Sequence, residues 1–149
     1  MVGVVVLGAA VVVAVVIALV RRLRDGRLRP ARVEPGRTPE GPDSGVTLLA
    51  ELGIAPGDNA ATLVQFSTAF CQPCVATRRI LDQVAGMIEG VGHIEVDAES
   101  HLDLVRRLGI MRTPTVLILD RHGNETKRAS GTPRKVDIIA AVGPLVMAP

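Results

Sequence analysis

Aromatic side chains are almost missing from this chain of 149 residues, which contains Phe66 and Phe70 but no tryptophan or tyrosine. A surface that stacks nucleic-acid bases on aromatic rings is therefore excluded as a main binding mode. The core must instead be built from valine, leucine, isoleucine and alanine. Cysteine is nearly as scarce, because Cys71 and Cys74 are the only two. Two cysteines cannot form a disulfide framework, and a bridge between residues three apart constrains little of the unfolded chain.

Net charge is small and unevenly distributed. Residues 1–45 contain seven arginines and four acidic residues, whereas residues 46–149 contain ten basic and eleven acidic residues. The excess of positive charge thus belongs to the N-terminal segment and not to the rest of the chain. This distribution argues against a nucleic-acid-binding face on the folded part and favours a membrane-facing segment.

A long apolar run opens the sequence. Residues 2–20 carry no charged side chain, and as a helix rising about 1.5 Å per residue they would span about 28 Å, close to the hydrocarbon thickness of a bilayer. A buried strand of a soluble protein is rarely so long. A signal peptide would begin with basic residues and end at a small-residue cleavage site, whereas this run ends at arginines. We therefore predict an uncleaved transmembrane anchor over residues 1–20.

The residues after this run indicate its orientation. Five arginines follow it closely, namely Arg21, Arg22, Arg24, Arg27 and Arg29. Because no basic side chain precedes the span, the positive-inside rule places the domain in the cytoplasm, with an extracytoplasmic domain as the alternative. The same arginines would attract anionic lipid headgroups. Residues 30–45 are rich in proline and glycine, so residues 21–45 are predicted to form a tether that is first basic and then Pro/Gly-rich.

From residue 46 the pattern indicates one α/β domain, residues 46–149. Residues 45–54 fit either a first strand or a short helix. The elements expected after them are strands over 61–66, 92–98, 113–120 and 125–130 and helices over 72–89, 99–109 and 132–146. This order predicts a mixed sheet with helices on its faces.

The two longer helices carry further signals. The helix over 72–89, ending at Gly90, is expected to bury one apolar stripe, consisting of Val75, Ile80, Leu81, Val84, Met87 and Ile88. The last helix is expected to use Thr132 as its N-cap and Pro133 as its first residue.

The cysteine pair admits three interpretations. A zinc site would need two further ligands, and the three histidines of the chain have no familiar ligand spacing. The second interpretation is a pair of passive buried cysteines. The third is a redox pair, because Cys71 lies at the start of a predicted helix, where free N–H groups favour a thiolate. Cys74 follows one turn later on the same face, where it can resolve a mixed disulfide, and Pro73 is tolerated so close to the helix start.

Four stretches between residues 60 and 146 form a recognisable set. They are "LVQFSTAFCQPC" at 63–74, "IEVDAE" at 94–99, "GIMRTPTVLILDRHGN" at 109–124, and Gly131 before the last helix. Together they resemble the thioredoxin family. The resemblance implies a thioredoxin-like fold and dithiol–disulfide exchange by Cys71 and Cys74, with no metal and no cofactor besides this pair.

The resemblance also implies residues that position a substrate. In that family the proline carried here by Pro114 is cis and faces the cysteines, and the backbone of the preceding residue, here Thr113, pairs with the substrate. Phe70 stands where the family usually has tryptophan, which keeps an apolar collar but loses an indole N–H. Gln72 and Pro73 stand where the family usually has Gly-Pro, a region that tunes its redox potential.

Three positions concern the proton of the second cysteine and the strand nearby. The acid that thioredoxins bury beneath this cysteine aligns with Gln65, and the lysine that often accompanies it aligns with His93. Because an amide cannot accept the proton of Cys74, that role is left to water, to the leaving thiolate or to His93. Asp97 matches a family aspartate and is expected to cap the next turn.

The function predicted from these features is reduction of protein disulfides by a membrane-tethered thioredoxin-like enzyme. The expected partners are proteins with disulfides or thiols, an upstream reductase that donates electrons, and the membrane. In the cytoplasm the resting form would be the dithiol. The alternative is a thioredoxin-like binding or scaffold module with little turnover, which the missing acid favours and the presence of both cysteines disfavours.

Overall fold

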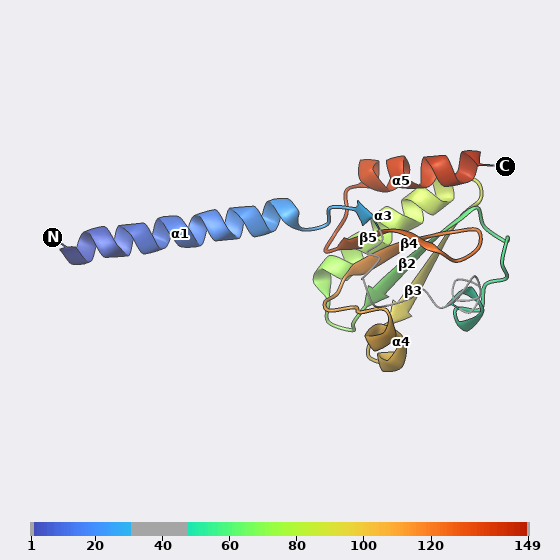
Figure 1. The fold of residues 1–149 in the computed structure, drawn as a ribbon, viewed down its shortest axis with the longest axis horizontal. Helices are drawn as coiled ribbons and strands as arrows, with labels where there is room; N and C mark the ends of the chain where they lie inside the picture. The colour runs from blue at the N-terminus through green and yellow to red at the C-terminus, as the bar shows by residue number, and fades with distance from the viewer. Residues whose placement is uncertain (1, 31–47, 149) are drawn as a thin grey trace.

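The computed structural model describes residues 2–30 and 48–148, and within the first helix it describes side chains only over residues 5–21. Helix α1 (Val2–Arg24) extends away from the remainder of the chain, which forms a sheet with helices on both faces (Figure 1). The Pro/Gly-rich part of the predicted tether, residues 31–45, lies outside the described residues.

The other elements follow in alternating order. They are β1 (Arg29–Pro30), β2 (Ala61–Ser67), α3 (Gln72–Met87), β3 (Val91–Asp97), α4 (Leu102–Arg107), β4 (Thr115–Asp120), β5 (Glu125–Ser130) and α5 (Lys135–Met147). Residues 48–51 are helical, so the described part of the ambiguous segment over 45–54 is a helix and not a strand.

The strands form one sheet in the order β1-β5-β4-β2-β3. β2 and β3 are parallel, with Gln65 opposite Glu95, and the other neighbouring strands are antiparallel. The mixed sheet that was predicted from the order of elements is therefore confirmed. Its register places the ends of β2 and β3 beside the N-terminus of α3.

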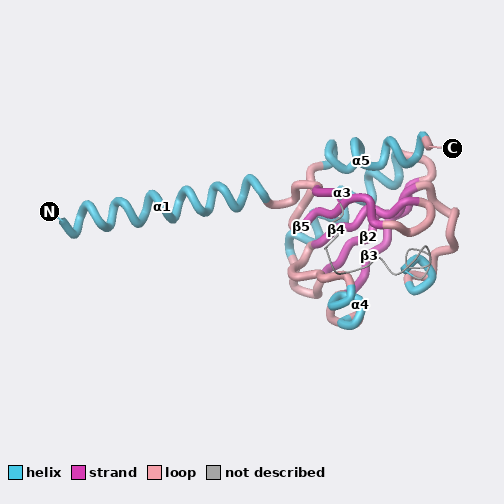
Figure 2. Tube along the Cα trace, in the orientation of Figure 1, coloured by secondary structure: helices cyan, strands magenta, loops and turns pink. Residues whose placement is uncertain are grey.

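Two apolar layers lie on opposite faces of the sheet, because side chains alternate along each strand. On one face, α3 and α5 pack against strand residues such as Leu63 and Ile118. On the other face, Phe66 and Leu117 pack with apolar residues of α4 and of residues 48–54. Figure 2 shows α3 and α5 on one side of the strands and α4 on the other.

The buried face of α3 differs from the predicted stripe. Its buried residues are Cys74, Thr77, Leu81 and Val84, whereas Val75 is 38% exposed and Met87 is 63% exposed. The prediction was wrong at these two positions because it followed apolar residues, while the spacing from Cys74 brings a threonine onto the packed face. The helix also ends at Met87, three residues before Gly90.

The start of α5 also differs from its prediction. Arg134 is the N-cap and the helix begins at Lys135, so Thr132 does not cap it. The Thr132 hydroxyl lies instead 3.2 Å from the Thr77 hydroxyl and 3.4 Å from the Pro73 carbonyl. These contacts connect the loop before α5 to the first turns of α3, and they use the group that would otherwise have capped α5.

Residues 25–30 are part of the folded domain, although they were predicted to belong to the tether. β1 pairs with β5 and so forms one edge of the sheet, and the Gly26 N–H donates to the Ser130 carbonyl at 2.8 Å. Asp25 forms an ion pair with Arg112 at 2.6 Å. Gly26 has a φ of 71°, and a Cβ there would collide with the backbone of the loop before α5. Only glycine allows this close approach.

The apolar N-terminal run is helical. α1 continues four residues past the run, to Arg24, and arginine is a good helix former. The large apolar side chains described in α1 are exposed, from 39% at Val20 to 71% at Val5. Within the described residues, no helix has the length and apolar character needed to cross a membrane, so the predicted transmembrane anchor is not supported.

Candidate active site

Cys71 and Cys74 form a disulfide at the N-terminus of α3. Cys71 is the N-cap residue, and its sulfur accepts a hydrogen bond from the Cys74 N–H at 3.2 Å. The predicted contact between a helix N–H group and the first cysteine is thus confirmed. Pro73 lies in the first turn, where its missing N–H leaves no helical hydrogen bond unmade.

The two cysteines differ in their exposure to solvent. Cys71 is partly exposed, whereas Cys74 is only 2% exposed. An external sulfur can therefore approach Cys71, while Cys74 lies behind it against the sheet. This asymmetry is suited to one cysteine that meets a partner and a second that acts within the protein.

The segment around Pro114 lies beside the loop that leads into Cys71. The Thr113–Pro114 peptide bond is cis, and the Thr113 hydroxyl lies 3.3 Å from the Thr68 hydroxyl. The Pro114 carbonyl accepts a hydrogen bond from the Gly131 N–H at 2.8 Å. The structure therefore brings Thr113 against the loop that leads into Cys71, although Thr68 and Thr113 are 45 positions apart in sequence.

Exposed side chains surround this segment and the cysteines. Phe70 is 99% exposed, and Gln72 and Pro73 are also exposed. Met111, two residues before Thr113, is 90% exposed. Sequence reasoning did not select Met111, although its place two residues before Thr113 was a usable signal.

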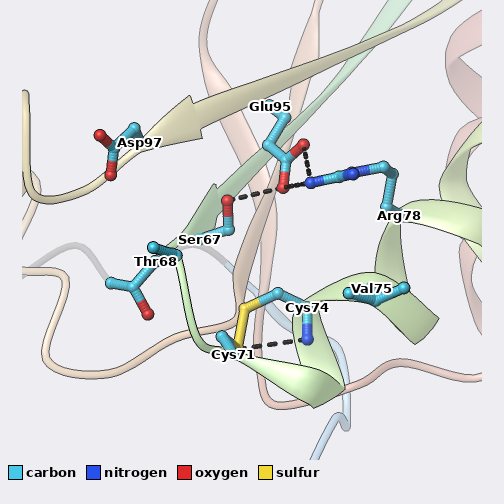
Figure 3. A pocket seen from close by; sticks show the side chains of 9 residues that line it. Ser67, Thr68, Cys71, Cys74, Val75, Arg78, Glu95 and Asp97 are labelled. Atoms are coloured by element: carbon cyan, nitrogen blue, oxygen red, sulfur yellow. Dashed lines mark hydrogen bonds and ion pairs between the residues drawn. A yellow bond between two sulfur atoms is a disulfide. The ribbon is translucent and has the colours of Figure 1, made fainter.

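A pocket of about 360 Å³ opens between the disulfide and the ends of β2 and β3. Figure 3 shows Cys71 and Cys74 on one side of it and Ser67, Glu95 and Arg78 on the other. This volume is large enough for several water molecules, each of which occupies about 30 Å³ in the liquid. The pocket is therefore a route by which water can reach the side of the second cysteine.

Glu95 is the centre of a hydrogen-bonded cluster in this pocket. Its carboxylate accepts hydrogen bonds from the Ser67 hydroxyl at 2.6 Å and from Arg78 at 2.7 Å. The Gln65 amide nitrogen donates to the same carboxylate at 3.4 Å and to the Cys74 carbonyl at 3.0 Å. Gln65 thus links the backbone of the buried cysteine directly to Glu95.

The surroundings of Glu95 keep it ionised. Burial by itself would raise the pKa of Glu95, but the hydrogen bonds from Arg78 and Ser67 and the charge of Arg78 together hold its pKa below the ordinary value. The side chain is 24% exposed, so the carboxylate remains in contact with solvent.

The position of the missing acid is fully buried. Gln65 is 0% exposed, and among the described residues its Oε1 atom has no hydrogen-bond partner. His93, which was considered as a proton acceptor for Cys74, is directed elsewhere, since its Nδ1 atom lies 2.7 Å from Asp82. Its side chain is 7% exposed.

Asp97 has the structural role that was expected. Its carboxylate accepts hydrogen bonds from the Glu99 N–H and the Ser100 hydroxyl, which stabilises the turn after β3. Within residues 2–30 and 48–148, there is no cluster of three or more histidine, cysteine or acidic side chains that could hold a metal ion.

Ser67, Arg78 and Glu95 were not identified from the sequence. The available signal was spacing, because Arg78 follows Cys74 by one helical turn and Glu95 shares a face of β3 with Val91 and His93. The register of β2 and β3, which periodicity does not specify, then places Glu95 beside Gln65.

This mixed sheet, with a C-x-x-C disulfide at the start of α3 and a cis proline preceded by a residue that contacts the loop into Cys71, defines a thioredoxin-like protein. A family model described as Thioredoxin matches residues 54–143, and the chain belongs to the thioredoxin family. Membership and the close cysteine pair indicate a thiol-disulfide oxidoreductase whose partners are protein thiols and disulfides.

Individual relatives agree with this assignment. The chain is 30% identical over 77 residues to a thioredoxin of Mycoplasma genitalium, covering 52% of this chain and 74% of the relative. It is similar to the structure of chloroplastic thioredoxin z, with a TM-score of 0.58 and 27% identity over 68% of this chain and 90% of the other. A mutant thioredoxin from Halobacterium salinarum NRC-1 shares the fold, with a TM-score of 0.59, 16% identity, and coverage of 69% and 87%.

Proposed function

We propose that this protein reduces disulfides in partner proteins and that α1 attaches it to a membrane. The observation that carries the catalytic part is the arrangement of the cysteine pair. Cys71 is partly exposed and caps α3, whereas Cys74 is buried one turn behind it. Such a pair divides the exchange between an attacking and a resolving cysteine.

The exchange starts from the dithiol form. The Cys71 thiolate attacks one sulfur of the partner's disulfide, which forms a mixed disulfide and releases the other partner sulfur as a thiolate. Cys74 then loses its proton and attacks Cys71 Sγ, so that the intramolecular disulfide forms and the second partner sulfur leaves. The partner gains two electrons and the chain loses two. A thiol reductase upstream must then return the pair to the dithiol.

The surface around the pair suits an extended protein segment. Phe70 and Met111 offer apolar area, and the backbone at Thr113, before cis-Pro114, would pair with the bound segment. Gln72 and Pro73 are exposed between the cysteines and would contact the same segment. This surface selects the partner, while the cysteines carry the chemistry.

Membrane attachment is supported by α1. Residues 2–20 carry no charge, and the described large apolar side chains from Val5 to Val20 are exposed. Transfer of such side chains from water into lipid is favourable, and the arginines that follow favour an anionic lipid surface. If α1 inserts into the bilayer, the arginines after it would place the domain in the cytoplasm by the positive-inside rule, with an extracytoplasmic domain as the alternative.

A binding module with little turnover is the second candidate. Gln65 favours it, because the buried amide beneath Cys74 cannot take up a proton as a carboxylate can. The two candidates differ in one measurable property, which is thiol-dependent turnover.

Insulin reduction by the full-length chain in mild detergent, with dithiothreitol as the electron source, tests the enzyme. The full chain is required because trimming to residue 46 would remove residues 25–30 from the domain. We expect turnover that Cys71→Ser abolishes, and a Cys74→Ser variant that accumulates a mixed disulfide with insulin. A wild-type chain that adds nothing to the rate of dithiothreitol alone would leave the binding module as the function.

Membrane attachment and topology have separate tests. Alkaline carbonate extraction of cell membranes should leave the full-length chain in the pellet and should release a chain that lacks residues 1–24. A membrane-impermeant thiol reagent should label Cys71 only after the cells are permeabilised. Labelling of reduced Cys71 on intact cells would place the domain outside.

A further inference from the structure

Resolution of the mixed disulfide requires that Cys74 lose its proton, and the buried group behind it is an amide. We infer that Glu95 accepts this proton, through water in the pocket that Glu95 and Cys74 share. This inference rests on the proposed function, since it assigns a group to the second step of the exchange. The role that thioredoxins give to a buried acid at the position of Gln65, on β2, would here belong to Glu95 on the neighbouring strand β3.

The geometry places Glu95 across the pocket from the cysteine. Both residues border the same cavity of about 360 Å³, and the Gln65 amide donates to the carbonyl of one and the carboxylate of the other, at 3.0 and 3.4 Å. The carboxylate is held in place by Ser67 at 2.6 Å. A fixed acceptor and a path for water are the two requirements for a proton relay.

The other charged groups near Glu95 are less suited to accept this proton. Arg78, on α3, stays protonated and cannot accept. Asp97 borders the pocket, but its carboxylate binds the turn after β3, whereas that of Glu95 binds the Gln65 amide that also contacts Cys74. His93, on the same strand, is paired with Asp82 of α3. Glu95 is therefore the best-placed acceptor, because Gln65 connects its carboxylate to the Cys74 backbone and its side chain is 24% exposed to solvent.

The proton is transferred and then passed on. The S–H bond of Cys74 breaks, its electron pair stays on sulfur, and the proton moves through water to Glu95. The Cys74 thiolate attacks Cys71 Sγ, the bond between Cys71 and the partner breaks, and the partner leaves as a thiolate that later takes a proton from Glu95 or from water. Because the pKa of Glu95 is held low, the carboxylate is ready at neutral pH but keeps the proton only briefly.

Two-phase kinetics with dithionitrobenzoate (DTNB) separate the two steps in the reduced full-length chain. Attack by Cys71 releases the first nitrothiolate, and attack by Cys74 on the mixed disulfide releases the second. We expect Glu95→Gln to leave the first phase unchanged and to slow the second by about a hundredfold near neutral pH, the weak end of general-base effects. The difference should disappear above the ordinary thiol pKa of about 8.5, where the proton is lost without help.

An electrostatic role would give the opposite sign. Removal of a negative charge near Cys74 favours its thiolate, so a change that acts through charge alone would speed the second phase. Asp97→Asn is the matched control, because it removes one carboxylate charge from the same pocket; it should leave the first phase unchanged and should not slow the second. Glu95→Asp should recover part of the lost rate.

The outcomes distinguish this inference from the function on which it rests. If the wild-type chain shows no second phase, the proposed exchange fails. If Glu95→Gln matches or exceeds the wild-type rate in the second phase, the exchange stands and the role of Glu95 is refuted. If Glu95→Gln also loses its first phase through misfolding, Arg78→Gln is the second test. Because Arg78 lowers the pKa of Glu95, its removal should shift the acidic side of the pH–rate profile of the second phase to higher pH. An unchanged profile refutes the role of Glu95.

Discussion

Glu95 and His93 lie two residues apart on β3, and each pairs with a charged residue of α3. Glu95 binds Arg78 and borders the pocket of the cysteines. His93 binds Asp82, one helical turn further from the cysteines, and its ring is 7% exposed. The two pairs are arranged in opposite ways. In the first pair the acidic residue is on the strand, whereas in the second pair it is on the helix.

The two pairs show that the position of a side chain relative to Cys74 matters more than its residue type in deciding which group can accept the proton. Histidine is the more usual proton acceptor near neutral pH, and it was the candidate that sequence reasoning could name. Two residues along a strand amount to about 7 Å, however, which separates a side chain at the reactive pocket from one beneath the helix. The pair at the pocket is therefore the functional candidate, and the other pair supports packing between α3 and β3.

Gln65→Asp should change the free energy of unfolding most, because it places a second acid beside the pair of Glu95 and Arg78. The new carboxyl would be fully buried and close to Glu95, so its pKa in the folded protein would be raised. The stability of the variant relative to wild type is then highest below the pKa that the new carboxyl has in the unfolded chain. It falls as pH rises through the higher pKa of the same carboxyl in the folded protein. We expect the variant to lose about 3 kcal/mol more at pH 8 than at pH 4.

Urea unfolding of both proteins at the two pH values measures this loss. His93→Asp, which replaces the histidine of the second pair by a carboxyl facing Asp82, serves as a comparison at the other site. A Gln65→Asp variant whose stability relative to wild type does not change with pH would contradict the burial of this position.

Ser67→Ala should have the next largest effect. The serine hydroxyl donates a hydrogen bond to the Glu95 carboxylate at 2.6 Å, and it is buried with an exposure of 7%. Loss of a hydrogen bond to a charged group costs about 2 kcal/mol of unfolding free energy. Chemical denaturation at neutral pH gives this value, and Ser130→Ala, which removes a hydroxyl away from the pair, is the control. A loss no greater than that of the control would show that the serine does not hold Glu95.

Arg78→Met should have a smaller effect that depends on pH. Arg78 helps to lower the pKa of Glu95 in the folded protein. The ion pair therefore stabilises the fold at pH values above the pKa of Glu95 in the unfolded chain, which is about 4.3. This contribution is lost as pH falls through the pKa of Glu95 in the folded protein. The variant should therefore be less stable than wild type at neutral pH and equal to it in acid. Unfolding curves from acid to neutral pH, repeated in high salt, measure the difference. A constant difference across the range would exclude the ion pair as its cause.

His93→Leu should have the smallest effect. The ring is buried, and among the described residues its Nε2 atom has no hydrogen-bond partner. A leucine of similar size removes that unpartnered atom together with the bond to Asp82, and the two changes offset each other to within about 1 kcal/mol. Insulin reduction and both DTNB phases should equal those of wild type. A slower second phase in this variant would return the proton-acceptor role to His93.

Local patterns in the sequence predicted much of the fold and the reactive pair. Strand alternation, helical spacing and the turn after β4 depend on residues close together in the chain. The position of Cys71 at a helix start depends on the few residues around it, and the "TPT" stretch marked Thr113 and Pro114 through the family resemblance. The errors occurred where a local rule was overridden, as at Thr132, whose hydroxyl binds across to α3.

By itself, the sequence determined an α/β domain with a redox-suited cysteine pair and an apolar N-terminal helix, because these follow from short-range spacing and composition, while the family resemblance added the cis-proline candidate. Only the tertiary structure decided that Glu95 faces Cys74 and that residues 25–30 pack on β5. Both depend on strand register and edge pairing, which bring together residues far apart in the chain. Packing of the sheet against its helices sets those contacts, and no local pattern encodes them.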